Sequence, residues 1–272
     1  MVEFDGICSE KTFVLGTKDS KVLLQEFLAL VMQSDDFWNY CEEHKSGGVN
    51  YFLNWSTLAK YEFYLPSIQE QKEIADKVWS AYRLKESYKK LLVATDEMVK
   101  SQFIEMFGGL CQDTPWSDVV TITNGKAYPE EYQEEGAYPI CGSGGIMCYG
   151  EKKLCNGNTT ILGRKGNINN PIFMESGYWI VDTAFSIDVD KAKLHPKFFY
   201  YWCCQYDFTK LNKQGVLPSL TRKDLEKVKM AIPQMRDQLK FVSIAEQADK
   251  SKFELKQCIE NIDKVIKSLI NG

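Results

Sequence analysis

The chain has 272 residues, of which 44% are hydrophobic and 26% are charged, the balance of a folded protein rather than a disordered one. It lacks an apolar run of the roughly 18 residues that a membrane span needs. It also lacks the basic and apolar segments of a secretory signal, so we expect a cytoplasmic protein whose nine cysteines are reduced. A net charge of −4 excludes a chain that is polybasic throughout, and two histidines leave little room for histidine-dependent catalysis.

The sequence contains an internal repeat. The segment Leu58–Pro66 matches Leu225–Pro233, which lies 167 residues further along the chain. Upstream of Gly48 the offset becomes 171, so that Leu23 meets Leu194. A match over several elements with one insertion indicates a duplication. The first copy begins at a point equivalent to about residue 172 of the second, and we therefore expect a partial unit followed by a complete one.

Each copy ends in a short capped helix, an apolar run and a long helix. Thr221 and Asp224 have the spacing of a capping box, and Asn54 occupies the place equivalent to Thr221. Pro66 and Pro233 then mark the expected first turn of the long helix, because a proline there loses no hydrogen bond.

The two long helices are expected to form a coiled coil. Residues 68–103 contain no glycine or proline, and apolar or small side chains recur at alternating spacings of four and three residues. Lys85 and Lys252 interrupt this seam at equivalent positions, and a polar seam residue can fix the register. The simplest arrangement pairs the helices antiparallel as a spacer, and a plain helical hairpin without a spacing role is the alternative. The other seam positions are Ile74, Val78, Ala81, Tyr88, Leu92, Thr95 and Val99 in the first copy, and Phe241, Ala245, Ala248, Leu255, Ile259, Ile262 and Ile266 in the second.

Residues 109–218 have the texture of a β-rich domain. Strand-like runs at 118–123 and 159–162 alternate with glycine-rich turns. The predicted fold class is therefore α+β, a β-rich domain combined with long antiparallel coiled-coil helices.

Two loops of this region are candidates for binding DNA. Arg164, Lys165 and Asn167 lie on a turn that starts at Gly163, and these side chains can contact guanine, phosphate and adenine respectively. The glycine-rich turn at Ser143 and Gly144 is the second candidate loop. An ordinary solvated β-turn is the alternative for the loop that starts at Gly163.

A second basic segment runs from Lys210 to Lys229, with six cations against two acidic residues. A positive turn at the start of a helix is a candidate phosphate clamp, and a solvated helix face is the alternative. The candidate DNA contacts in this segment are Lys213, Gln214, Ser219, Thr221 and Arg222.

Motifs of catalysis are missing from the sequence. It contains no P-loop and no methyltransferase motif, so we expect neither a catalytic residue nor a bound cofactor. Cys141, Cys148 and Cys155 are spaced by seven, which does not match the usual spacing of zinc ligands. Cys203 and Cys204 belong to an aromatic-rich helix and are expected in the core.

Three groups of residues carry a family resemblance that covers essentially the whole chain. They are Ile161–Asn167 with Tyr178–Phe185, Leu194–Tyr201 leading to Gly215–Leu220, and Ile232–Gln238, which Leu65–Gln71 echoes. In these segments the chain resembles the DNA-specificity subunits of type I restriction–modification systems.

The resemblance implies a non-catalytic subunit in which each target-recognition domain reads one half of a bipartite site on double-stranded DNA. It also implies that the helices set the spacing and dock two modification subunits, which supply S-adenosylmethionine-dependent methylation, and that a translocating restriction subunit joins them. It divides the chain into a partial first recognition domain (1–66), a central spacer helix (67–108), a complete second recognition domain (109–233) and a C-terminal spacer helix (234–272).

The partial first domain leaves two other functions open. A docking-only or decoy subunit would bind the modification subunits and contribute little DNA reading. A half-subunit that dimerises with itself would read a palindromic site. In either case the partner of the truncated chain is a second copy of itself or a complementary fragment.

Overall fold

The computed structural model describes residues 7–9, 11–211 and 219–271, and the chain divides into two compact units. The first unit comprises the residues up to Thr95 together with those from Ser251 onward, and the second comprises Asp96–Lys250. Each long helix contributes to both units. The division of the chain into four segments stays a prediction.

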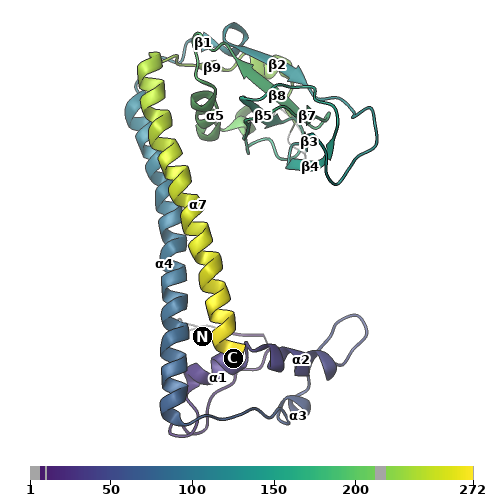
Figure 1. Cartoon of the computed structure of the whole chain (residues 1–272), viewed down its shortest axis with the longest axis vertical. Helices are drawn as coiled ribbons and strands as arrows, with labels where there is room; N and C mark the ends of the chain where they lie inside the picture. Colours follow the sequence, from purple (N-terminus) through teal and green to yellow (C-terminus); the bar gives the residue numbers. More distant parts are fainter. Residues whose placement is uncertain (1–6, 10, 212–218, 272) are drawn as a thin grey trace. The chain divides into compact units, whose positions relative to one another are not determined.

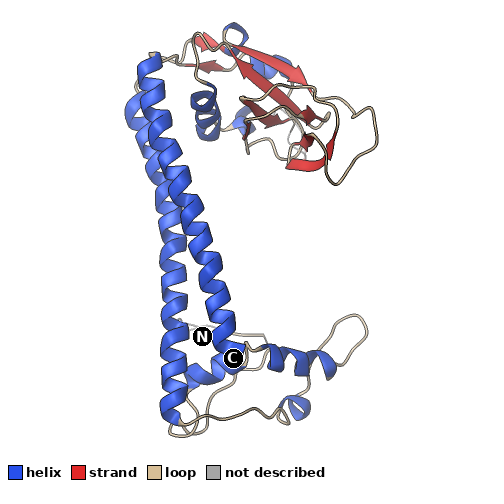
Figure 2. Ribbon diagram, in the orientation of Figure 1, coloured by secondary structure: helices blue, strands red, loops and turns tan. Residues whose placement is uncertain are grey.

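The first unit is helical (Figures 1 and 2). Among its described residues there is no strand, only an isolated bridge between Ser46 and Phe52. Its helices are α1 (Gln25–Val31), α2 (Asp35–Glu43), α3 (Trp55–Leu58), the first part of α4 (Ile68–Phe107) and the last part of α7 (Met235–Asn271).

Within the first unit, α4 and α7 pair antiparallel through an apolar seam. Val78 of α4 and Ile266 of α7 are buried in one cluster, to which Leu30 of α1 also belongs. Lys85 Nζ lies 2.5 Å from Asp263 Oδ1 on the other helix, so the polar seam residue has a charged partner across the interface. The expected seam positions of this unit are all buried or half-buried: Ile74, Val78, Ala81, Lys85, Tyr88, Leu92, Thr95, Lys252, Leu255, Ile259, Ile262 and Ile266.

The second unit contains all of the named strands (Figure 2). One sheet has the order β2-β8-β5-β6, a second has the order β4-β3-β7, and β1 pairs with β9. All pairings are antiparallel except that of β3 with β7. The strands are β1 (Thr114–Pro115), β2 (Val120–Asn124), β3 (Tyr138–Gly142), β4 (Gly145–Gly150), β5 (Thr159–Gly163), β6 (Ile172–Met174), β7 (Trp179–Ile180), β8 (Ala184–Val189) and β9 (Lys229–Met230). The helices between them are η1 (Trp116–Asp118), α5 (Pro196–Gln205), η2 (Phe208–Leu211) and α6 (Arg222–Glu226).

The core of the second unit joins the sheet to the ends of the two long helices. Phe198 of α5 packs against Phe103 and Phe107 of α4 and against Phe241 of α7. The seam residues Val99, Phe241, Ala245 and Ala248 are buried in the same cluster. Burial of this aromatic set removes a large apolar area from water and fixes the helix ends on the domain. The predicted α+β class with antiparallel coiled-coil helices is confirmed.

A buried glutamine begins each long helix with the same set of hydrogen bonds. In the second unit, Gln238 Nε2 donates to the carbonyl oxygens of Pro233 (2.8 Å) and Lys193 (2.9 Å), and its Oε1 accepts the N–H of His195 (2.8 Å). In the first unit Gln71 makes the equivalent bonds. Its partners are Pro66 O (2.9 Å), Val22 O (2.9 Å) and Leu24 N (3.0 Å).

The residues that make these bonds correspond to one another at the two offsets of the sequence repeat. Gln71 and Pro66 correspond to Gln238 and Pro233 at an offset of 167, whereas Val22 corresponds to Lys193 at 171. Both glutamine side chains are fully buried. The common geometry supports the duplication, and it ties the start of α4 to the segment that leads into α1 and the start of α7 to the segment that leads into α5.

One strand of the second unit has no equivalent in the first. By the offset of 171, residues 13–18 correspond to β8, the strand that pairs with both β2 and β5. No strand pairs with residues 13–18 in the described part of the first unit. Phe13 is 48% exposed and Val14 is 79% exposed, whereas the corresponding Ala184 and Phe185 are buried. The lack of neighbouring strands explains this exposure.

Three local expectations need correction. Pro66 and Pro233 lie two residues before α4 and α7 rather than in their first turns, because Ser67 and Gln234 precede the first helical residues. Ser67 and Glu70 form a capping box there, and hydrogen bonds from Ser67 hold the pKa of the Glu70 carboxyl below its usual value.

Asn54 occupies the N-cap position of α3 but makes no side-chain capping bond. Cys204 is exposed, and only Cys203 lies in the core, because consecutive residues of α5 face different directions. None of the described helices is long and apolar enough to cross a membrane.

We predict that Gln238→Ala destabilises the protein by about 2–4 kcal/mol, because it leaves the buried carbonyl group of Pro233 and the part-buried carbonyl of Lys193 and N–H of His195 without their partners. Urea denaturation of the full chain, with hydrogen exchange at the His195 amide, measures the effect. Gln234→Ala is the matched control, since this glutamine is exposed. Equal denaturation midpoints and equal protection of the His195 amide in the two variants would contradict the role of the buried glutamine.

Candidate nucleic-acid interface

Thr183, which precedes β8, connects the two loops that the sequence singled out. Its Oγ1 accepts a hydrogen bond from the N–H of Ser143 at 3.3 Å, in the turn between β3 and β4. Its carbonyl oxygen accepts the N–H of Arg164 at 2.8 Å and the N–H of Lys165 at 3.3 Å, just after β5. The two loops therefore lie next to each other in the folded unit.

A third predicted segment joins them. The N–H of Leu220 donates to the carbonyl oxygen of Arg164 at 2.9 Å, and Ser219 forms an isolated antiparallel bridge with Lys165. The residues around Thr183 that the sequence proposed as DNA contacts are called the Thr183 cluster below: Ser143, Gly144, Arg164, Lys165 and Ser219.

The loop after β5 is shaped by two glycines. A Cβ atom at Gly163 would lie 1.9 Å from the carbonyl oxygen of Asn167, so the loop folds back tightly on a residue that must lack a side chain. Gly166 has a φ of +74°, in the left-handed region that glycine adopts readily. This compact turn presents Lys165 and Asn167 to solvent.

The cluster is locally positive. Lys165 is exposed, and Arg164 is half-buried with its guanidinium carbon 5.8 Å from the centroid of the Phe185 ring. Among the residues that the structure describes, neither cation has an ion pair with an acidic side chain. Two uncompensated cations beside backbone turns are groups that can bind phosphate and base edges.

The rest of the basic segment is placed differently. Thr221 Oγ1 accepts the N–H of Asp224 at 3.2 Å and donates to Asp224 Oδ2 at 2.6 Å, so its hydroxyl caps α6. Arg222 Nε lies 2.7 Å from Glu226 Oε1 on the same helix. Their contact with DNA stays a prediction, and these internal partners would have to be exchanged for phosphate.

Lys213 and Gln214 lie outside the described residues.

Sequence reasoning missed Thr183 as the residue that joins the loops. Its only signal is its position immediately before a buried strand, in a segment that contributes to the family resemblance, and that position does not reveal which loops it contacts.

The spaced cysteines lie at different depths in the second unit. Cys141 and Cys155 are buried and Cys148 is half-buried, and burial raises the pKa of the Cys141 thiol to about 11. No group of three or more His, Cys, Asp or Glu residues arranged to hold a metal ion occurs among residues 7–9, 11–211 and 219–271.

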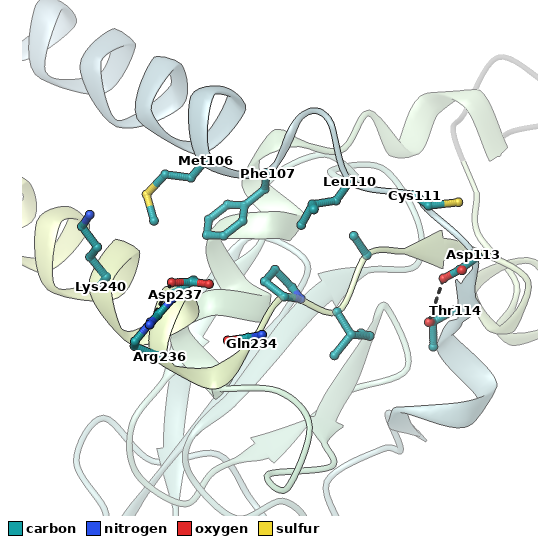
Figure 3. A pocket seen from close by; sticks show the side chains of 13 residues that line it. Met106, Phe107, Leu110, Cys111, Asp113, Thr114, Gln234, Arg236, Asp237 and Lys240 are labelled. Atoms are coloured by element: carbon teal, nitrogen blue, oxygen red, sulfur yellow. Dashed lines mark hydrogen bonds and ion pairs between the residues drawn. The ribbon is translucent and has the colours of Figure 1, made fainter.

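A hollow of about 640 Å³ lies between the end of α4 and the start of α7 in the second unit (Figure 3). Phe107 and Leu110 line it together with the charged side chains of Arg236, Asp237 and Lys240. Arg236 Nε donates a hydrogen bond to Asp237 Oδ1 at 3.2 Å, so these two charged groups are paired with each other.

Comparisons with known proteins agree with this architecture. Three solved structures share the fold at low sequence identity. The S subunit of a type I restriction-modification system from M. genitalium is 15% identical, with a TM-score of 0.66 over 93% of this chain and 73% of that chain. The HsdS subunit from Thermoanaerobacter tengcongensis is 18% identical, with a TM-score of 0.50 over 90% of this chain and 68% of that chain.

A third structure comes from work on complex assembly and conformational transition of the type I R-M system. It is 16% identical, with a TM-score of 0.63 over 93% of this chain and 71% of that chain. Comparison with curated protein sequences gave no match. The model of the type I restriction modification DNA specificity domain matches residues 112–264, which are more than half of the chain. The chain therefore belongs to the family of type I restriction-modification DNA specificity domains.

Proposed function

We propose that the second unit reads one half of a bipartite DNA site through the Thr183 cluster. The observation that carries this proposal is the convergence of three loop segments with two uncompensated cations, within a domain of a DNA-specificity family. A lysine positions the phosphate backbone, and arginine and asparagine on the same loop discriminate bases. The proposed contacts are Arg164 and Lys165 of the cluster, together with Asn167 on the same loop.

The chain itself is proposed to be the non-catalytic specificity subunit of a larger complex. The family match extends from the recognition domain into α7, as far as residue 264, and a related structure was solved to explain assembly of a type I system. The antiparallel pair of α4 and α7 then serves as the spacer that docks methyltransferase and restriction subunits. The reactions would be carried out by those subunits.

We predict that Lys165→Ala weakens DNA binding by the complex of this chain with its methyltransferase subunit and lowers the salt dependence of the affinity. Loss of one phosphate contact reduces the slope of log affinity against log salt by about 1. Fluorescence anisotropy on duplex DNA at several salt concentrations measures both quantities. Adding Arg164→Ala should lower the affinity further.

Lys191→Ala is the matched control for this experiment. Lys191 is an exposed lysine just after β8, whereas Thr183 lies just before that strand. Six residues of strand separate the two ends by roughly 20 Å. Equal affinities and equal salt slopes for Lys165→Ala, Lys191→Ala and the unaltered protein would refute the Thr183 cluster as the DNA contact. Assembly of the complex without any sequence-selective binding would favour the docking-only function.

A second candidate function follows from the exposed segment of residues 13–18. Residues 13–18 pair with no strand of the described residues, and Phe13 and Val14 at their start are exposed. Gln25 already bonds the Thr17 N–H and the Leu15 carbonyl oxygen, and the remaining backbone groups can pair with another chain. An antiparallel pair formed by the same segment of two copies is self-complementary under two-fold symmetry. On this basis the chain forms a dimer whose two recognition domains read a palindromic site.

This dimer predicts a solution mass of twice 31.3 kDa for the isolated chain. Light scattering at tens of micromolar protein measures the mass, and Val14→Asp should return the chain to a monomer because it places a charge on the pairing segment. Val265→Asp is the matched control, since Val265 is exposed on α7. A monomer before any substitution would rule out self-pairing through this segment.

A further inference from the structure

Met147 occupies an irregular position at the edge of the sheet formed by β4, β3 and β7. Ile140 pairs with Cys148, and Cys141 pairs with Ile146, so the register shifts between these two pairs and Met147 has no partner on β3. This is the pattern of a β-bulge, which redirects a side chain relative to the regular alternation of a strand. β4 is the last strand in the order of its sheet, and on its outer side Tyr149 forms a bridge with Gln133.

The bulge places Met147 beside the Thr183 cluster. A Cβ atom added to Gly142 would lie 3.0 Å from Met147 Sδ and 3.0 Å from Thr183 Oγ1, so the sulfur and the hydroxyl flank the same backbone position. The Thr183 hydroxyl accepts the N–H of Ser143, and its carbonyl oxygen accepts the N–H of Lys165. The thioether is therefore close to Thr183, which bonds the backbone of both candidate loops.

Met147 is 61% exposed, although it lies within strand β4. It does not contribute to any of the buried clusters of the described residues. The nearby cations would attract a polyanion, and the apolar group that duplex DNA offers in its major groove is the 5-methyl group of thymine. A thioether is flexible and polarizable, which suits contact with a methyl group.

We propose that Met147 supplies an apolar base-edge contact, to the methyl group of a thymine in the half-site that the Thr183 cluster binds. This inference rests on the proposed function and adds a specificity-determining residue to it. Met147 contributes discrimination at one base pair, whereas Lys165 contributes affinity that is common to all sequences.

The test removes the Met147 thioether and the thymine 5-methyl group, each alone and both together. The half-site is first obtained by selection from a random duplex pool with the complex of the full chain and its methyltransferase subunit. Each thymine of the half-site is then replaced by deoxyuridine, which lacks only the 5-methyl group. The affinities of the unaltered protein, Met147→Ala and Met147→Leu are measured on each duplex.

We expect one deoxyuridine position to weaken binding of the unaltered protein about fourfold, the size of one buried methyl contact. The same replacement should leave the affinity of Met147→Ala unchanged, and Met147→Leu should retain the dependence on the methyl group. The salt slope of Met147→Ala should equal that of the unaltered protein. Ile146→Ala is the matched control, because Ile146 is an adjacent exposed apolar residue that keeps its regular pairing with Cys141.

Equal deoxyuridine effects in the unaltered protein and Met147→Ala at every position would overturn the inference, as would a half-site without thymine. Loss of assembly with the methyltransferase subunit in Met147→Ala would also overturn it and assign this face to a protein contact. If Lys165→Ala weakens binding while the thymine experiment shows no coupling, only the role of Met147 fails. If Lys165→Ala has no effect, the proposed function fails.

Discussion

The buried glutamine at the start of each long helix is the constraint on which the rest of the structure depends. A primary amide has two donors and one acceptor, and Gln238 uses all of these groups on the backbone at Pro233, Lys193 and His195. A buried polar group without a hydrogen-bond partner costs about 1–3 kcal/mol. The connection that leads into α7 and the segment before α5 are therefore held in the one relative geometry that satisfies all three bonds. Gln71 repeats the arrangement, so both helix starts are fixed by the same chemistry.

The helices and the repeat could be predicted from the sequence because both leave periodic signals. Apolar side chains at alternating spacings of four and three residues define one face of a helix whatever it packs against. The seam is polar at Lys85, where Asp263 supplies the opposite charge. The exact helix starts were less well predicted, because Ser67 and Gln234 extend the connections beyond the prolines and a sequence pattern defines helix ends only within a residue or two.

The candidate interface could be predicted only in part. Arg164 and Lys165 are visible as a glycine-flanked basic turn, but the contact of that turn with Ser143 depends on hydrogen bonds to Thr183, far away in the sequence. Met147 was missed because a bulge depends on strand register, which the sequence of one strand does not encode. The DNA contacts expected of Thr221 and Arg222 remain predictions, since both side chains have partners within α6.

We propose that this chain gives a methyltransferase its sequence specificity. Genome-wide mapping of methylated bases in cells that carry the modification subunit, with and without this chain, tests this proposal. We predict a methylated motif that appears only when the chain is present and disappears when Arg164 and Lys165 are both replaced by alanine. The absence of any chain-dependent motif, while the two proteins still form a complex, would contradict it.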